Sequence, residues 1–130
     1  SNIWTNEALC AVAAAAYLSL MGPRGLERLD KIILDNSSYA MRELETLNGV
    51  KAPLFEAQHF KEFVVGFDGT GLSASHINAK LLQRGIQGGI PLHDQFRELG
   101  QSALCCVTEL HTREGVDRLV AATRAILEER

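Results

Sequence analysis

The chain has 130 residues, 46% of them hydrophobic, and its 13 basic and 16 acidic residues leave a formal charge of −3. This composition is typical of a folded domain with a core of its own and excludes a disordered chain. The sequence has no basic stripe, so we expect neither nucleic acid nor an anionic membrane as a partner. No run approaches the ~20 apolar residues that a membrane span requires. We therefore expect a single domain over residues 1–130.

The cysteines are Cys10, Cys105 and Cys106, an odd number without metal-ligand spacing. Such usage indicates a reducing setting, and we expect a cytoplasmic protein without a signal peptide. The chain does not begin with methionine and opens at once on a helix start. We interpret it as a fragment of a longer protein, in which Ser1 and Asn2 are either native or a cloning remnant.

The first predicted helix runs from Ala8 to Met21, with Thr5 or Asn6 as its N-cap and Gly22 and Pro23 as its stop. It has no polar face. A helix that is apolar on every side needs cover on every side. Two interpretations remain open: a central helix enclosed by its own domain, or a helix covered in part by a partner.

Pro23 then opens an amphipathic surface helix that ends at Asn48 and Gly49. A short edge strand is predicted over residues 50–55, weakened by Pro53. Residues 60–67 alternate with two largely apolar faces, which predicts a central, covered strand. The following loop, residues 67–76, contains glycines but no Lys-Ser/Thr pair, so we interpret it as a turn with a helix cap at Ser73 or Ser75.

The stretch from Ala79 to Leu92 joins a helical pattern to an extended one. The helix over residues 75–84 ends with Arg84 in its last turn and Gly85 as a left-handed C-cap. Gly88 and Gly89 then allow either close approach of another segment or a tight turn inside the domain. An apolar run resumes over residues 90–92.

The run from Ala103 to Thr108 predicts a buried strand, and Thr112 caps the last helix, whose final residues, 128–130, are expected to fray. The order of elements is helix, helix, strand, strand, helix, strand, helix. It predicts an α/β sandwich with a mainly antiparallel sheet of three or four strands covered by helices.

Reacting groups are scarce. The four histidines lie in four segments without a pair at i and i+4, so no metal site is expected. Cys105 and Cys106 lie within an apolar run, where burial makes a thiol inert. The four lysines lie outside small-residue loops that follow strands, where a Schiff-base lysine is expected. The isolated chain is therefore predicted to be inactive, with no catalytic residue of its own.

Three segments together resemble one family. The opening SNIWTNEALCA is similar to SNICTxQALxA, INAKLLQRGIQGGIPL to a helix followed by RGIxGGxPL, and ALCCVTELHTREGVDRLV to xLxCVTExxTxEEID. The family is glycine dehydrogenase (decarboxylating), the P-protein of the glycine cleavage system. The match is to the C-terminal end of subunit 1, the subunit equivalent to the N-terminal half of the single-chain form.

The resemblance implies the small C-terminal domain of a fold-type I PLP-dependent transferase. In such an enzyme, pyridoxal phosphate serves as electron sink while glycine loses CO2, and the aminomethyl group passes to the lipoyl arm of the H-protein. The Schiff-base lysine belongs to subunit 2 of a heterotetramer, so no cofactor is expected on this fragment alone. The missing large domain and partner subunit would cover the apolar helix.

The resemblance also implies residues near the cofactor and substrate cleft. Ser1, Asn2 and Thr5 match the opening motif, which lies where the large domain passes into the small one. Thr108 and Glu109 match a Thr-Glu pair that either lines the cleft or caps the next segment. Gly88 and Gly89 would allow close packing of the backbone there. The departures are Trp4, Leu110 and His111, and the last two replace a commonly basic pair.

Two other hypotheses remain. In the first, the chain is the small domain of an aminotransferase or cysteine desulfurase, in which Arg113 would hold a substrate carboxylate. Alternatively, it is a freestanding regulatory α/β module that binds a small metabolite. The last hypothesis predicts that no apolar helix is left exposed.

Overall fold

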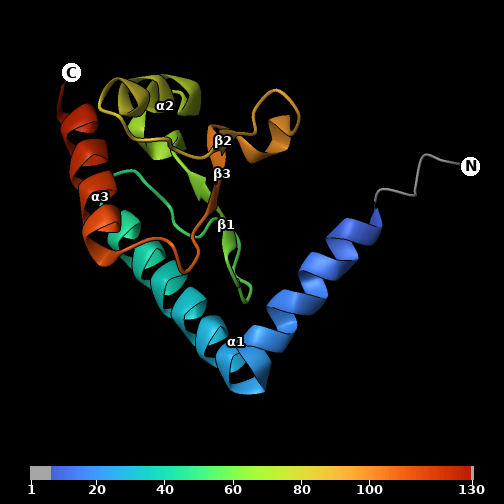
Figure 1. Cartoon of the computed structure of the whole chain (residues 1–130). Helices are drawn as coiled ribbons and strands as arrows, with labels where there is room; N and C mark the ends of the chain where they lie inside the picture. Colours follow the sequence, from blue (N-terminus) through green and yellow to red (C-terminus); the bar gives the residue numbers. More distant parts are fainter. Residues whose placement is uncertain (1–6, 130) are drawn as a thin grey trace, which may run out of the picture. The chain divides into compact units, whose positions relative to one another are not determined.

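The computed structural model describes residues 7–129. Thr5 and Asn6, the predicted N-caps of the first helix, lie outside this range. The chain divides after Lys31 into two compact units. In chain order its elements are α1 (Glu7–Glu45), β1 (Glu62–Gly66), η2 (Asp68–Thr70), α2 (Ala74–Gln83), β2 (Ile90–Pro91), η3 (Arg97–Leu99), β3 (Ser102–Cys106) and α3 (Arg113–Glu128) (Figure 1).

The first unit contains the N-terminal part of α1. Gly22 has φ 60° and ψ 180°, outside the helical region, and Pro23 follows it, so α1 is two helices that meet at a kink. The predicted stop at Gly22 and Pro23 is thus confirmed. Every residue from Glu7 to Leu20 is exposed, including Leu9 at 79% and Leu20 at 87%. This exposure agrees with the interpretation that a partner covers the helix in part.

By length and composition α1 could cross a membrane, because an 18-residue window of it has a mean hydropathy of 1.3. The prediction that no segment is apolar enough for a membrane span is therefore wrong for α1. Within α1, the helical backbone is interrupted at Gly22.

The second unit is built on a three-stranded antiparallel sheet in the order β1-β3-β2. Val65 pairs with Ala103, and Ile90 pairs with Leu104. The predicted α/β fold with a mainly antiparallel sheet is confirmed. The prediction that residues 60–67 form the central strand is wrong, because β3 has a partner on each side and therefore occupies the middle.

The predicted edge strand over residues 50–55 is also wrong. Lys51 forms only an isolated bridge with Gly66, and the Leu54 N–H donates to the Val64 carbonyl at 2.7 Å. Between these two contacts, Pro53 has no N–H to continue a ladder. The segment therefore runs beside β1 without forming a strand.

One face of the sheet carries the core. Phe63 and Val65 of β1 and Ala103 of β3 lie on this face and are at most 2% exposed. The C-terminal half of α1, α2 and α3 pack against them (Figure 1). Each helix contributes a stripe of buried apolar side chains: Ala40 and Leu44 from α1, Ile77 and Leu81 from α2, and Val116, Val120 and Ile126 from α3.

The ends of α2 and α3 follow the predicted signals. The Ser73 hydroxyl accepts from the His76 N–H at 3.1 Å, and the Thr112 hydroxyl accepts from the Gly115 N–H at 3.1 Å. Gly85 has φ 69°, and the next N–H, that of Ile86, donates to the Leu81 carbonyl at 3.0 Å. This pattern is a Schellman C-cap and confirms the predicted helix end.

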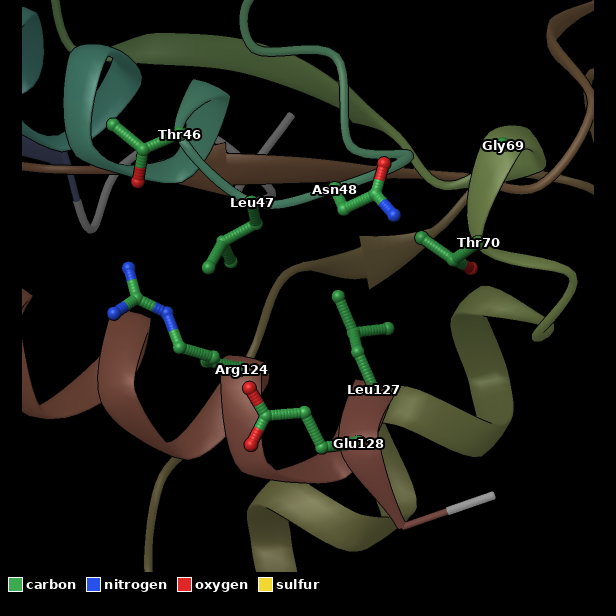
Figure 2. Close-up of a pocket in the computed structure, with 8 residues that line it drawn as sticks. All are labelled: Thr46, Leu47, Asn48, Gly69, Thr70, Arg124, Leu127 and Glu128. Carbon is green, nitrogen blue, oxygen red and sulfur yellow. The ribbon is translucent and has the colours of Figure 1, made fainter.

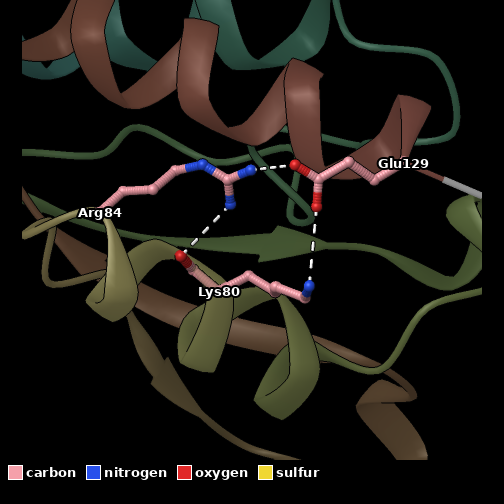
Figure 3. A network of polar contacts seen from close by, with 3 residues as sticks. All are labelled: Lys80, Arg84 and Glu129. Atoms are coloured by element: carbon pink, nitrogen blue, oxygen red, sulfur yellow. Dashed lines mark hydrogen bonds and ion pairs between the residues drawn. The ribbon is translucent and has the colours of Figure 1, made fainter.

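An ion-pair network joins α2 to the end of α3 (Figure 3). Glu129 pairs with the Arg84 guanidinium, and its other carboxylate oxygen lies 3.6 Å from Lys80 Nζ. Arg84 also donates to the Lys80 carbonyl at 3.3 Å. The prediction that residue 129 frays into solvent is therefore wrong, because two cations on α2 hold its carboxylate.

Candidate functional site

The predicted site residues fall into two groups. Ser1, Asn2 and Thr5 lie outside the described residues. The other four, Gly88, Gly89, Thr108 and Glu109, belong to two loops of the second unit, one leading into β2 and one leaving β3.

The glycine pair lies against the backbone of β3 and the side chains of α2. A Cβ on Gly89 would lie 2.6 Å from the Leu104 carbonyl oxygen and 2.9 Å from Cys105 Sγ. A Cβ on Gly88 would overlap the Asn78 side chain and lie 3.1 Å from Leu81 Cδ1. Of the two predicted alternatives, close approach is therefore the correct one, and the approaching segments belong to this chain.

Asn78 fixes the position of the glycine pair. Its amide Nδ2 donates a hydrogen bond to the Gly89 carbonyl. Asn78 follows the buried Ile77 on α2 and is itself half-buried. The amide thus anchors the loop to the helix while the missing side chains of the glycines let the loop approach.

Residues 107–112, which we call the β3–α3 corner, are organised by their own polar groups. The Thr108 N–H donates to His111 Nδ1 at 3.0 Å, and the His111 N–H donates to the Thr108 carbonyl at 3.2 Å. The Leu110 N–H donates to the Thr108 hydroxyl at 3.3 Å. Thr108 thus acts as a cap within its own turn, whereas the next helix, α3, is capped by Thr112.

Asn36 of α1 holds this corner from outside. Its amide Nδ2 donates to the Thr108 carbonyl at 3.2 Å and to the His111 carbonyl at 2.8 Å. One amide group therefore links the end of β3 to the start of α3. The backbone of the corner is restrained on both sides, by its own turn and by α1.

The ring of His111 has a defined orientation. Because Nδ1 accepts from the Thr108 N–H, a neutral imidazole carries its proton on Nε2. His111 is exposed, so this N–H is available as a hydrogen-bond donor.

Glu109 and Leu110 form the tip of the corner. Leu110 is 83% exposed. Glu109 is also exposed, and within residues 7–129 its side chain has no hydrogen bond or ion pair. Of the predicted Thr-Glu pair, Thr108 is used by the turn itself, whereas the carboxylate of Glu109 is free to meet another group.

A cavity of about 150 Å³ brings the two loops together. Its lining includes Gly88 and Gly89, Asn78, Cys106 and His111, together with core side chains of the sheet and helices. Thr108 and Glu109 do not line it. The structure therefore places the glycine pair beside the β3–α3 corner through His111, while the predicted Thr-Glu pair lies outside the cavity.

The two adjacent cysteines differ. Burial raises the pKa of the Cys105 thiol to about 12, with a smaller contribution from Cys106. Cys105 is therefore inert as predicted. Cys106 is exposed, so its prediction as a core residue is wrong. Successive residues of a strand point to opposite faces, and only the face of Cys105 is covered by helices.

A second cavity, of about 390 Å³, is lined by residues that follow α1, by η2 and by the last turns of α3 (Figure 2). Arg124 and Glu128 extend into it from α3, facing Thr46 and Asn48 beyond the end of α1. It shares no residue with the first cavity. Its Thr70 hydroxyl donates to the Phe67 carbonyl at 2.7 Å and accepts from the Leu72 N–H, so that hydroxyl is already satisfied.

Arg113, the candidate carboxylate ligand of the aminotransferase hypothesis, has another contact. Its guanidinium lies 4.8 Å from the centre of the Tyr39 ring. The Tyr39 hydroxyl donates to Asp117 at 2.6 Å, and this hydrogen bond is the main cause that raises the pKa of Tyr39. Arg113 thus stacks on α1.

Asn36 and Asn78 were missed by the sequence analysis, although each carried a signal. Asn36 lies three residues after the buried Ile33, and Asn78 lies four residues after the buried Ala74. A polar residue on the buried stripe of a helix indicates a specific hydrogen-bond partner. Here the partners are loop carbonyls that are distant in sequence.

The fold defines the class of protein first: an α/β domain in which helices cover a three-stranded antiparallel sheet. A crystal structure of glycine decarboxylase (P-protein) of the glycine cleavage system, in inhibitor-bound form, superposes with a TM-score of 0.84 at 28% identity. The superposition covers 97% of this chain and 28% of that one.

The sequence comparisons specify the family. The family model of the glycine cleavage system P-protein matches residues 1–123, and the chain belongs to this family. The probable glycine dehydrogenase (decarboxylating) subunit 1 of Staphylothermus marinus is 41% identical over 129 residues, covering 99% of this chain and 27% of that protein. The corresponding protein of Moorella thermoacetica is 42% identical over 127 residues, covering 98% and 28%. The chain thus spans about a quarter of its relatives' length.

Proposed function

We propose that the chain is the C-terminal part of a glycine dehydrogenase (decarboxylating) subunit 1 and contributes to the cleft without supplying a reacting group. Its partners would be the second, PLP-carrying subunit, in a heterotetramer, and the lipoyl H-protein, with glycine as the substrate of the cytoplasmic complex. The observation that carries this proposal is the 41% identity over 99% of the chain to a protein named as that subunit.

The family is PLP-dependent, but the described residues do not fit this cofactor. PLP enzymes use a lysine for the Schiff base. Lys31 pairs with Glu27 at 2.6 Å, and Lys80 pairs with Glu129. Lys51 and Lys61 are exposed and line neither of the two cavities described above. The Schiff-base lysine would therefore come from the partner subunit.

The residue of this chain that we assign to the cleft is Glu109. It is exposed at the tip of a corner whose backbone is fixed by Asn36, Thr108 and His111. A carboxylate on a restrained turn can accept a hydrogen bond or orient a cation without the entropy loss of ordering a loop. Glu109 would thus position a group of the substrate or of the partner subunit, while Thr108 keeps the turn.

The test is glycine decarboxylation by the full-length subunit assembled with its partner, PLP and H-protein, followed by exchange of labelled bicarbonate into glycine. Glu109→Gln should lower kcat/KM by roughly tenfold or more if the charge acts on a bound group. Glu98→Gln, another exposed carboxylate of the same unit, is the matched control and should leave the rate unchanged. Absence of exchange in the assembled wild-type complex would refute the proposed function.

The competing hypotheses fare less well. A freestanding regulatory module predicts no exposed apolar helix, whereas Leu9, Leu18 and Leu20 are all more than half exposed. The aminotransferase hypothesis needs Arg113 for a carboxylate, yet its guanidinium lies over Tyr39. Arg113→Ala in the assembled enzyme should therefore change KM for glycine little.

A further inference from the structure

The His111 ring closes the β3–α3 corner from the inside. Its Nδ1 atom lies 3.0 Å from the Thr108 backbone nitrogen and 3.3 Å from the Thr108 hydroxyl oxygen. A backbone N–H donates only to a ring nitrogen that carries no proton. The bond between the Thr108 N–H and the ring therefore exists only while the ring is neutral and holds its proton on Nε2.

The other bonds of the corner do not depend on the charge of the ring. The Asn36 amide donates to the Thr108 and His111 carbonyls, and the His111 N–H donates to the Thr108 carbonyl at 3.2 Å. Carbonyl oxygens keep these bonds when the ring gains a proton. Protonation of His111 therefore removes the inner restraint of the corner and leaves the outer restraint in place.

Glu109 directly follows the bond that the ring controls. Thr108 is half-buried, and within residues 7–129 its N–H has no second acceptor, so loss of the ring as acceptor leaves an unpaired donor. The turn lowers this cost by rotating the Thr108 N–H toward water. Glu109 is the next residue, and its carboxylate moves with that rotation because no bond of its own holds it within the described residues.

Other titratable groups of the segments that meet at the corner do not bind the ring. Within residues 7–129, no hydrogen bond or ion pair joins any of them to His111. Arg113 lies over Tyr39, whose hydroxyl donates to Asp117. The set comprises Glu109 of the corner, Arg113, Glu114 and Asp117 of α3, Asp35 and Tyr39 of α1, Cys105 and Cys106 of β3, and Lys61 before β1. The charge of the ring therefore acts on the turn through Thr108.

We propose that His111 is the positioning residue of Glu109: its unprotonated Nδ1 holds the turn that presents the carboxylate, and protonation of the ring releases that turn. The inference rests on the proposed function, which assigns Glu109 to the cleft, and adds its regulation. Histidine is the side chain that changes charge between about pH 5 and pH 8. The restraint on Glu109 is complete at the upper end of this range and is lost as the pH falls.

The first test follows the turn without catalysis, by NMR of the 15N-labelled 130-residue chain. From about pH 8 to about pH 5.5, the amide signals of Thr108 and Glu109 should shift in step with the ring signals of His111. In His111→Asn, the side-chain oxygen replaces Nδ1 as acceptor and does not titrate, so both amides should keep their high-pH positions. His93→Asn, on another exposed histidine of the same unit, is the matched control and should leave the wild-type shifts unchanged.

The second test measures glycine exchange by the assembled enzyme. The ratio of kcat/KM of the wild type to that of His111→Asn should fall at least about twofold from pH 8 to pH 6, because only the wild type loses the restraint. His111→Ala lacks the acceptor and should lower kcat/KM at both pH values. In a Glu109→Gln background, His111→Ala should add little, because a residue that acts through Glu109 has no carboxylate left to position.

Three results would overturn the inference: amide signals that do not follow the ring, one pH profile shared by the wild type and His111→Asn, or additive effects of Glu109→Gln and His111→Ala. The proposed function fails by a different result, the absence of exchange in the wild-type complex at every pH. Amide signals that follow the ring would then still support control of the turn by His111, since the NMR measurement requires no activity.

Discussion

Two apolar regions of this molecule behave differently. In residues 32–129, apolar side chains lie in stripes on three helices and on one face of a sheet, and they bury each other, with Phe63 at 2% and Ile77 at 0% exposure. In residues 7–21, apolar side chains surround the helix, and Leu9, Leu18 and Leu20 are more than half exposed.

The difference teaches what an apolar pattern implies for folding. A stripe of period 3.6 has one face to bury, and one neighbouring layer is enough. A helix that is apolar on every side buries its whole surface only when other segments cover every side. The region 32–129 thus closes its own core, whereas residues 7–20 of the apolar helix are all exposed.

The largest expected effect separates the two regions directly. Phe63→Ala should destabilise the chain by about 3–5 kcal/mol, because it leaves a cavity under the sheet. Leu9→Ala should change the stability of the same chain by less than about 0.5 kcal/mol, because its side chain is already exposed. Urea denaturation followed by circular dichroism measures both. A large effect of Leu9→Ala would break the comparison.

Substitution of Gly89 tests the close packing of the glycine pair against β3. Gly89→Ala should destabilise by about 1–3 kcal/mol, because the new Cβ would meet the Leu104 carbonyl at 2.6 Å. Gly115→Ala is the matched control on α3, where the new Cβ has room, at 3.5 Å from Thr112 Oγ1. That change should stabilise by roughly 0.5–1 kcal/mol through helix propensity. Equal effects at the two positions would contradict the packing described here.

The pH dependence of stability tests the burial of the Cys105 thiol. Cys105 has a pKa raised from 9.0 to about 12, so its folded form retains a proton that the unfolded chain loses. Its contribution to stability is complete below pH 9 and is lost as the pH rises from 9 toward 12. The urea midpoint of the chain should therefore fall above pH 9, and Cys105→Ala should weaken that fall.

Labelling gives the same contrast at neutral pH. Cys10 is exposed on the apolar helix and should react quickly with a maleimide in the 130-residue chain, whereas Cys105 should not react until the chain unfolds. Equal labelling rates for Cys10 and Cys105 would show that the region 32–129 is not closed.

The smallest effect concerns the surface network of the second region. Glu129→Gln removes the ion pairs with Arg84 and Lys80, and should lower the free energy of unfolding by less than about 1 kcal/mol, because the partners are partly exposed. The loss should disappear in 1 M salt, which screens exposed charges. Glu114→Gln, on an exposed residue of the same helix, is the control.

The sequence by itself determined the local structure of this protein. Gly22 with Pro23, Ser73, Gly85 and Thr112 set helix ends where they were predicted, because capping and left-handed turns depend on a few neighbouring residues. The periodic stripes predicted the helices, and the motifs predicted the family.

Only the tertiary structure decided which strand lies in the middle, which side of Cys105 and Cys106 is covered, and what approaches Gly89. Strand order and register depend on partners distant along the chain, so β3 displaced β1 from the centre although both are apolar. The bonds of Asn36 and Asn78 join residues whose proximity no local pattern encodes. The apolar helix could be predicted from its residues alone because hydrophobicity on every side is itself a local property.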